Sequence, residues 1–337
     1  MQNNYTIDHR PLLRAATRDG VMLPVIDVTD PRFTIADDAD SRARLFAQTT
    51  AEEERNRRLP RFIMRFLMRR AARRSRLLRA IFGGDATFLD GITTYVMKLG
   101  AENLPPPYDS PVDRRVAGSA HLKLLRLRTQ QVAHLLADGL AADLTKAPDA
   151  PLALINIAGG PAIDSMNALI VLRERNAGLL RRRIVIHVLD QDDAGPCFGR
   201  NALAALTADG APLAGLDVAF EHRHYDWNAT ASLDALLREL ADSGAVVGAS
   251  SEGGLFEYGS DDAIVGNLQA LRAGNARAVT GSVTSDDERR RRMMTASRFK
   301  LVPRGLKGFA PLAERGGWQV ARSESAQLSE QVLLAPA

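Results

Sequence analysis

The pattern of apolar and polar positions changes near residue 150. Beyond it, short apolar runs alternate with segments in which apolar residues recur every three to four positions. The short runs are typical of buried strands and the longer segments of amphipathic helices. Alternation of the two predicts a mostly parallel sheet with helices on both faces. The predicted strands span 153–158, 184–190, 217–224, 244–250 and 277–283.

The end of the chain departs from this alternation. Two strand-like runs, 319–323 and 331–334, are too close in sequence for a helix to lie between them. We expect them to pair as an antiparallel hairpin at the edge of the sheet. Earlier in this region, Ser260-Asp261-Asp262 supplies an N-cap and first-turn acids for one helix. Residues 285–288 have capping-box spacing for another.

Helical patterns prevail before residue 150. One covers 37–57, a second runs from Pro60 to a stop at Gly83-Gly84, and a long helix is predicted over 113–146. Within the first 35 residues, 21–26 has a strand-like pattern, and 88–98 has a mixed one.

Residues 146–151 are predicted to form a linker between these two patterns. We therefore expect a mainly helical N-terminal region, 1–150, and an α/β domain, 151–337.

Composition narrows the class of protein. Hydrophobic residues make up 45% of the 337 positions, as in ordinary globular proteins, and no apolar run approaches the ~18 residues of a membrane span. Residues 1–10 lack a secretory signal pattern. Cys197 is the single cysteine, so an internal disulfide and a cysteine metal cluster are excluded. These features predict a cytoplasmic protein.

The positive charge is concentrated in one segment. The chain carries a net charge of +4, but residues 55–82 contain eleven arginines and no acid, which leaves −7 for the remainder. A surface that binds nucleic acid is expected to spread its basic residues across a fold. We therefore expect 60–82 to be a docked amphipathic helix with a solvated arginine face. Contact with a membrane surface is the main alternative and nucleic-acid binding is not favoured.

The most informative segment joins a buried run, a turn of small residues and an acid. The first run ends in Asn156-Ile157-Ala158-Gly159-Gly160, and the next buried run ends in Asp190-Gln191. Small residues allow close approach of a ligand to the backbone, and a carboxylate at the end of the second strand can accept both hydroxyls of a ribose. This arrangement predicts a nucleoside site.

The ordered motifs resemble the class I S-adenosylmethionine-dependent methyltransferases over residues 150–337. That family has five βα units followed by an antiparallel hairpin. Its first motif is an acid followed by glycines at alternate positions, and Asn156, Ala158, Gly160 and Ala162 look like the same turn. Here Asn156 replaces the acid, and only Gly160 is glycine. Asn156 can therefore hydrogen-bond the methionine part of the cofactor but brings no charge for its ammonium.

The later motifs of the family have counterparts too. Asp190 matches the acid at the end of the second strand. Asp226 and Trp227 resemble the acid and aromatic residue beside the adenine. The motif of the fourth strand, which lines the methyl-transfer site, corresponds to 248–254 and includes Ser250, Ser251 and Glu252. The resemblance implies S-adenosylmethionine as cofactor, with Gly159 and Gln191 among its contacts.

The residues that would act on the methyl acceptor are less sharply indicated. Glu252 is the candidate for contact with the acceptor or for proton removal, and His224 is a second candidate base. Ser251, Tyr258 and Tyr95 are candidate acceptor contacts. The resemblance implies that the N-terminal region is a lid over the cofactor that selects the substrate. We further hypothesise that 85–110 and 62–82 close over a small-molecule acceptor. The sequence is compatible with a homo-oligomer and does not determine the oligomeric state.

Two other functions compete with this interpretation. A non-catalytic protein that binds S-adenosylmethionine or S-adenosylhomocysteine is mildly favoured by the neutral Asn156. An NAD-dependent oxidoreductase is disfavoured because the G-x-G-x-x-G pattern is absent and Pro161 removes an amide that a pyrophosphate would use. His222 and His224 lie on the same side of a strand, but no third ligand accompanies them, so a metal site is not expected.

Overall fold

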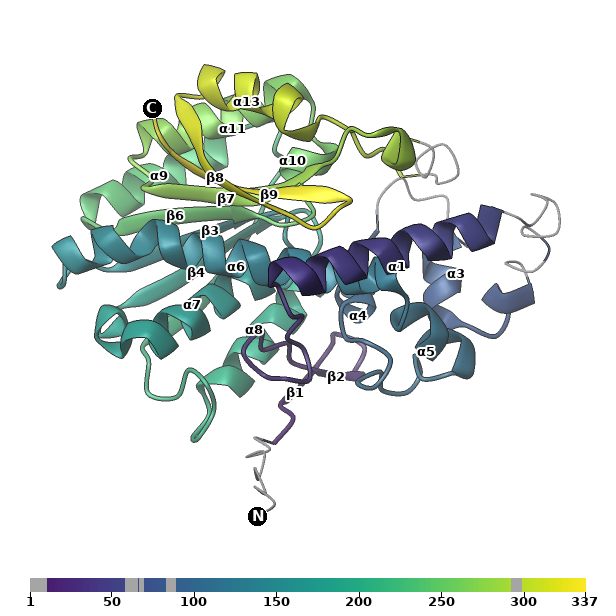
Figure 1. Ribbon diagram of the computed structural model, residues 1–337. Helices are drawn as coiled ribbons and strands as arrows, with labels where there is room; N and C mark the ends of the chain where they lie inside the picture. Colours follow the sequence, from purple (N-terminus) through teal and green to yellow (C-terminus); the bar gives the residue numbers. More distant parts are fainter. Residues whose placement is uncertain (1–10, 58–65, 67–69, 83–88, 292–298) are drawn as a thin grey trace, which may run out of the picture.

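A computed structural model describes residues 11–57, 66, 70–82, 89–291 and 299–337 (Figure 1). Its centre is a seven-stranded sheet in the order β5-β4-β3-β6-β7-β9-β8. The first five of these strands are parallel, whereas β9 runs antiparallel to β7 and to β8. The strands are β3 (Leu152–Ile157), β4 (Ile184–Asp190), β5 (Val218–His224), β6 (Val246–Ser251), β7 (Ala278–Thr284), β8 (Trp318–Ser325) and β9 (Ser329–Pro336).

These strands confirm the predicted sheet and the antiparallel hairpin at its edge. The chain leaves β3 toward β4 and β5 on one side, and then returns to β6 and β7 on the other. In the register, Asn156 of β3 lies between Val188 of β4 and Ser250 of β6. The carboxyl ends of β3 and β6 therefore flank the point where the strand order reverses, which is where open α/β sheets bind ligands.

Helices cover both faces of the sheet, and the alternation of side chains in β3 explains why. Leu152 and Leu154 pack into the core beneath one helical layer, whereas Ala153, Ile155 and Ile157 pack into the core beneath the other. One layer contains α6 (Ala120–Lys146), α7 (Ile163–Asn176) and α8 (Ala194–Thr207), and the other contains α9 (Ala231–Asp242), α11 (Asp261–Ala273) and α13 (Gly305–Arg315) (Figure 1).

Shorter elements complete the α/β part. A 3-10 turn, η1 (Ala177–Leu180), follows α7, and α10 (Leu255–Tyr258) follows β6. Ser260 caps α11 through its side chain, with Asp261 and Asp262 in the first turn, as predicted. The helix predicted from 285–288 begins at residue 288, and its further course lies outside the described residues.

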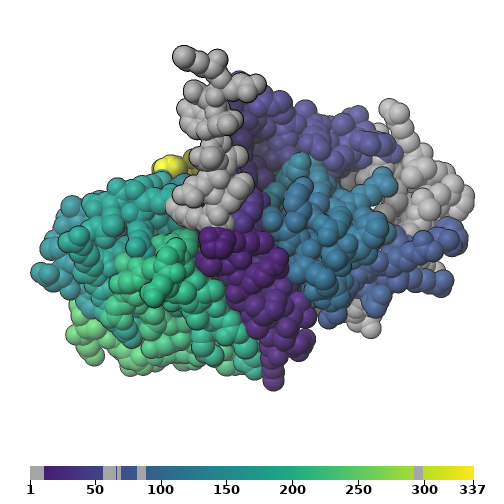
Figure 2. All heavy atoms as spheres, turned by 90° about the horizontal axis from the view of Figure 1, so that it is seen from below, coloured from purple at the N-terminus to yellow at the C-terminus, as the bar shows by residue number. Residues whose placement is uncertain are grey.

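The N-terminal region is mainly helical and adds a small hairpin. It contains β1 (Arg14–Ala16), β2 (Met22–Pro24), α1 (Ala39–Arg57), α3 (Arg76–Phe82), α4 (Gly91–Met97) and α5 (Pro111–Ala117). The predicted strand-like run 21–26 corresponds to β2, and its partner β1 was not predicted. Seen from below, the purple segment with this hairpin lies between the green α/β part and the blue N-terminal helices (Figure 2).

Two predicted helices prove to be interrupted. The predicted helix 113–146 breaks between Gly118, the C-cap of α5, and Ser119, whose extended backbone begins α6. The predicted continuous helix 60–82 is broken at 73–75, where Ser75 Oγ accepts a hydrogen bond from Leu78 N at 2.9 Å. The remainder of this arginine-rich segment lies largely outside the described residues. No helix among the described residues is long and apolar enough to span a membrane.

Helix α6 joins the N-terminal region to the sheet. It contacts α7, β6, β7 and β9, and α1 packs across it. Its midpoint is almost entirely buried, including Leu135 and Leu136. Although it precedes residue 150 in the chain, this helix therefore completes one of the two layers on the sheet.

Candidate functional site

The turn after β3 holds its backbone in a conformation that side chains disfavour. Ala158 and Ala162 have φ angles of 53°, and Gly160 has one of 58°. In a residue with a Cβ atom, this left-handed region costs on the order of 1–3 kcal/mol and persists where the surroundings enforce it, often at functional sites. Ala158 N donates to Leu189 O at 2.8 Å, which ties the turn to β4. The turn is therefore a constrained element at the switch point of the sheet.

Asp190, the last residue of β4, closes onto this turn. Its Oδ2 accepts a hydrogen bond from Gly160 N, and its Oδ1 accepts one from Asp192 N, each at 2.9 Å. Burial raises the pKa of the Asp190 carboxyl, although both backbone N–H groups act in the opposite direction. The structure thus brings the predicted acid directly to the predicted turn.

The start of α4 covers the turn from the other side. A Cβ atom built on Gly160 would lie 3.1 Å from Gly91 Cα, and one built on Gly195 would lie 2.8 Å from Gly160 Cα. Three segments therefore meet through residues without side chains. Asp90 fixes the start of α4 here, because its Oδ1 accepts from Thr93 N at 2.7 Å. The start of α4 therefore lies directly against the glycine turn.

Asn156 lies beneath the turn in a buried polar network. Its Nδ2 donates to Asp164 Oδ1 at 2.8 Å, to Ser250 Oγ at 3.0 Å and to Ser165 Oγ at 3.3 Å. All four side chains are buried. Asn156 Oδ1 and Asp164 Oδ2 are buried acceptors that lack a hydrogen-bond donor within the described part of the chain. Such atoms are costly to bury unless a ligand or water supplies a donor.

Asp164 is the most strongly perturbed acid of this network. Burial, and after it the charge of Glu252, raise the pKa of its carboxyl to about 6, although Ser250 and Lys98 act in the opposite direction. The carboxyl therefore titrates close to neutral pH. A perturbed acid with a free acceptor oxygen, beside a constrained turn, is typical of a ligand site.

A buried ion cluster lies at the carboxyl end of β6. Glu252 pairs with Lys98, at the end of α4, and with Arg128 of α6. Arg128 Nη1 also lies 3.2 Å from Glu257 Oε1. Burial raises the pKa of Glu252, but the charges and hydrogen bonds of Arg128 and Lys98 outweigh it and leave the pKa below its ordinary value. Glu252 is therefore an ionised carboxylate that joins the N-terminal region to the sheet.

Several predicted site residues are grouped at these strand ends. Asn156, Ala158, Gly159, Gly160 and Asp190 form the turn and its immediate partners. Ser250 belongs to the network under the turn. The neighbouring hydroxyl of Ser251 donates to Ile157 O at 2.9 Å and accepts from Leu255 N at 2.8 Å, so it holds the ends of β3 and β6 together.

The predicted adenine contacts lie at the end of β5. Tyr225 N donates to Asp190 O at 3.2 Å, which places the segment after β5 against the end of β4. Asp226 Oδ1 accepts from Asn228 N at 3.0 Å and therefore stabilises a local turn. Trp227 is half-buried, whereas Gln191, Asp226 and His224 are exposed at the same end of the sheet.

Tyr95, a predicted acceptor contact, lies buried in the interior. Its ring is buried against Phe198, with ring centroids 4.6 Å apart. Its hydroxyl donates a hydrogen bond to Pro24 O at 2.7 Å and accepts one from Ile26 N at 2.9 Å. Backbone groups of the chain therefore occupy the hydroxyl both as donor and as acceptor. Tyr95 therefore holds the segment at the end of β2 to α4. Tyr258 is half-buried, and burial raises the pKa of its hydroxyl above the ordinary value.

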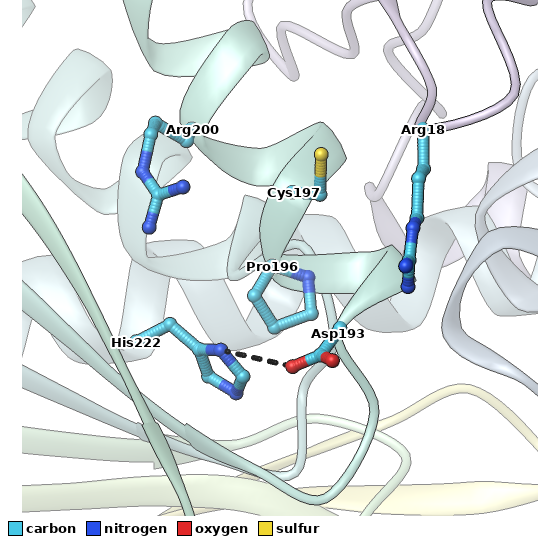
Figure 3. A pocket seen from close by; sticks show the side chains of 6 residues that line it. All are labelled: Arg18, Asp193, Pro196, Cys197, Arg200 and His222. Atoms are coloured by element: carbon cyan, nitrogen blue, oxygen red, sulfur yellow. Dashed lines mark ion pairs between the residues drawn. The ribbon is translucent and has the colours of Figure 1, made fainter.

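A small cavity of about 270 Å³ lies next to the end of β4, between α8, β5 and the β1–β2 turn (Figure 3). Arg18, Cys197 and Arg200 line it together with His222. His222 Nε2 is 3.1 Å from Asp190 O, and its Nδ1 is 3.7 Å from Asp193 Oδ1. This histidine therefore braces the backbone of β4 from the α8 side of the sheet. Within the described residues, no group of histidine, cysteine and acidic side chains is placed to hold a metal ion.

Three residues of the site were missed at the sequence level. Asp164, Lys98 and Arg128 each carry a charge into a buried position. Asp164 was visible as an acid in the first turn of an otherwise apolar helix, which is a usable signal. The pairing of Lys98 and Arg128 with Glu252 spans 154 and 124 residues, and no local pattern reports it.

Comparison with known proteins supports the fold assignment. No protein-family model and no curated protein sequence matches the chain. Among solved structures, a possible exported protein from Bordetella parapertussis is similar, with 15% identity, a TM-score of 0.53, and coverage of 90% of this chain and all of the other. The pyocyanin biosynthetic protein PhzM shows 16% identity, a TM-score of 0.39, and coverage of 77% and 75%.

Human N-acetylserotonin methyltransferase, solved in complex with S-adenosylmethionine, shows 11% identity, a TM-score of 0.37, and coverage of 64% of this chain and 56% of its own. Of these three, the Bordetella parapertussis protein, with a TM-score above 0.5, supports the fold, and at 15% identity it supports the fold alone. In its strand order, its antiparallel C-terminal hairpin and its two helical layers, the chain has the Rossmann-like fold of the class I S-adenosylmethionine-dependent methyltransferases.

Proposed function

We propose that this protein is an S-adenosylmethionine-dependent methyltransferase that acts on a small molecule. The observation that carries the proposal is the contact between Asp190 Oδ2 and Gly160 N at 2.9 Å, at the switch point of the sheet. It joins the acid that suits a ribose to the turn that suits a close backbone approach. In this assignment Asp190 and Gln191 hold the ribose, and Asp226 with Trp227 contacts the adenine.

The buried acceptors under the turn fit the methionine part of the cofactor. Its ammonium group is a donor, and Asn156 Oδ1 and Asp164 Oδ2 are acceptors without a donor in the described part of the chain. Asp164 would also supply the negative charge that Asn156 lacks. We therefore add Asp164 to the predicted contacts Asn156, Ala158, Gly159 and Ser250. When bound, the cofactor supplies an activated methyl group on a positively charged sulfur.

The N-terminal region has the role of a lid in this proposal. Gly91 lies on Gly160, and Lys98 at the other end of α4 pairs with Glu252. A ligand that lies over the turn must first separate Gly91 from Gly160. Once reclosed, this cover would exclude water and hold the acceptor in line, and these two effects can supply most of the acceleration of a displacement reaction.

Its contacts favour a positioning role for Glu252 over proton removal. Both carboxylate oxygens face cations, and the pKa of Glu252 lies below its ordinary value. A general base works best when its pKa lies near the working pH. Proton removal from a hydroxyl or amine acceptor would therefore fall to another group, with exposed His224 as the remaining predicted candidate. An acceptor that is already an anion would need no base.

Calorimetric titration of the purified chain with S-adenosylmethionine, S-adenosylhomocysteine and NAD tests the proposal. We expect the first two to bind in the micromolar range and NAD not to bind. Binding of NAD alone would instead assign the chain to the oxidoreductases, and binding of none of the three would contradict the proposed cofactor.

A non-catalytic protein that binds the same cofactor is the second candidate. The tight contact of Gly91 with Gly160 and the neutralised Glu252 favour it, because they leave few free groups near the proposed transfer site. Turnover separates the two functions. Formation of S-adenosylhomocysteine with a panel of phenol, amine, thiol and carboxylate acceptors supports the enzyme, whereas binding without turnover on every acceptor supports the binding protein.

A further inference from the structure

A second cavity lies in the N-terminal region, away from the glycine turn. Its volume is about 560 Å³, within the range of small-molecule sites, and it lies between the start of α1, the turn at 102–103 and α6. None of the residues proposed to hold the cofactor lines it. Its polar lining includes Arg32, Arg44, Glu102, Lys123 and Arg126.

Arg126 is the buried centre of this lining. Its side chain belongs to α6 and the residue is only 7% exposed. Nη1 donates to Arg32 O at 3.2 Å, whereas the buried Nε has no partner among the described residues. The neighbouring backbone makes room for the guanidinium, because a Cβ atom built on Gly100 would lie 2.8 Å from Nη1.

Cations outnumber acids in the cavity. Four of its side chains are cationic and one, Glu102, is acidic. Arg32 is paired with Asp30. For Arg44, Lys123 and Arg126, no ion pair with an acid occurs within the described ranges. Of these three, only Arg126 is buried, and Glu102 attracts it without forming an ion pair. A buried guanidinium without an ion-pair partner is unfavourable, so the excess of cations in this lining favours a bound anion.

We propose that this cavity binds a small organic molecule with two or more negative charges, such as a phosphate ester or a polycarboxylate. Guanidinium groups suit both, because their planar donors match carboxylate and phosphate oxygens. Thr34, Ser41, Gln48 and Asn103 add polar groups at the wall, and Ile35 and Leu45 add apolar surface for the remainder of the molecule.

The site is separate from the proposed cofactor site. Arg126 and Arg128 are two positions apart on α6, so their side chains leave the helix about 200° apart. Arg128 pairs with Glu252 at the end of β6, whereas Arg126 lines the cavity. The inference therefore stands whether or not the chain transfers methyl groups.

Calorimetric titration of the full chain with pyrophosphate and with citrate tests the proposal. We expect at least one of them to bind, with an affinity that falls as salt is raised from low to high concentration. Stronger binding of pyrophosphate indicates a phosphate ester as the natural ligand, and stronger binding of citrate indicates a polycarboxylate.

Matched variants place the bound anion. Lys123 is half-buried and Arg44 is exposed, so Lys123→Gln and Arg44→Gln should leave the fold intact. Each should weaken binding about tenfold, the effect of losing one charge-assisted hydrogen bond. Arg126→Gln should abolish it. Arg277→Gln, at an exposed position remote in sequence and outside the cavity lining, should leave binding unchanged. Failure of both anions to bind, or equal binding by Lys123→Gln, Arg44→Gln and the unaltered chain, would overturn the proposal.

Discussion

Asn156 Nδ2 donates a hydrogen bond to Asp164 Oδ1 at 2.8 Å, and this contact links the end of β3 to the first turn of α7. It places a carboxylate eight residues downstream of the position where the family's first motif has its acid. The side chains share one buried network, in which each retains an acceptor oxygen without a donor in the described residues. Asp164 can therefore supply the negative charge that the neutral Asn156 lacks.

The raised pKa of Asp164 predicts a specific pH dependence of stability. Burial raises this pKa from 3.8 in the unfolded chain to about 6 in the folded one, so the folded state binds the proton more tightly. Its contribution to stability is fully present below pH 3.8 and is lost as pH rises through about 6. Relative to Asp164→Asn, the unaltered chain should lose about 3 kcal/mol of unfolding free energy over this interval. Urea denaturation of both chains at several pH values measures it, and parallel pH profiles would refute the assignment.

The raised pKa of Asp164 also predicts that the affinity for the cofactor depends on pH. An ammonium group binds the ionised form of Asp164 better than the protonated form. Affinity for S-adenosylmethionine should therefore rise as pH increases from 5 through about 6, and Asp164→Asn should remove this rise. Titration calorimetry at pH 5 and 7.5 compares the two chains. A pH dependence that survives in Asp164→Asn belongs to another group.

Glu252→Gln should chiefly destabilise the fold. The substitution leaves Lys98 and Arg128 buried with one fewer carboxylate, and breaking a buried pair costs about 3–5 kcal/mol. Because the pKa of Glu252 is lowered in the folded chain, its stabilising effect should also fade as pH falls toward that pKa. Urea denaturation measures the loss, and Glu239→Gln, in an exposed pair with Arg223, should cost much less. A stable Glu252→Gln chain that has lost only methyl transfer would restore Glu252 as the catalytic base.

Gly195→Ala should disturb the contact between α8, the turn and α4. The new methyl group would lie 2.8 Å from Gly160 Cα, and this neighbour is backbone that cannot rotate away. We expect a loss of about 1–3 kcal/mol, as for overpacked cores. Gly266→Ala in α11 is the matched control, because its Cβ would meet only Thr230 Cγ2 at 3.8 Å, and it should be neutral or stabilising. Thermal unfolding of the two variants compares them directly, and equal melting temperatures would argue against the tight glycine contact.

Much of the sheet could be predicted because its strands are continuous apolar runs buried on both faces. β3 and β7 are buried at every position, and each is an uninterrupted run of uncharged residues. The observed boundaries of both strands lie within one residue of the predicted ones. The edge hairpin followed from the short spacing between its two strands. Asp190 was predictable because it directly ends such a run.

Long-range pairing and local breaks could not be predicted in the same way. The break at Gly118 and Ser119 lies inside a segment whose apolar residues continue the helical period across it. The burial of Tyr95 is a further example, because its sequence neighbourhood does not reveal that its hydroxyl binds the backbone of Pro24 and Ile26. The division at residue 150 follows the change in pattern, whereas the packing of α6 depends on contacts with strands more than a hundred residues away.

The proposed role of Asp190 in holding a nucleoside is tested most directly by titrating S-adenosylmethionine into three chains: the unaltered protein, Asp190→Ala and Asp193→Ala. Asp193 is the matched control, because it belongs to the same loop and its side chain is 70% exposed. We predict micromolar binding by the unaltered protein and by Asp193→Ala, and a loss of at least tenfold in Asp190→Ala, provided that its thermal unfolding shows a folded chain. Undiminished binding by a folded Asp190→Ala, or no binding by the unaltered protein, would contradict the cofactor site at the end of β4.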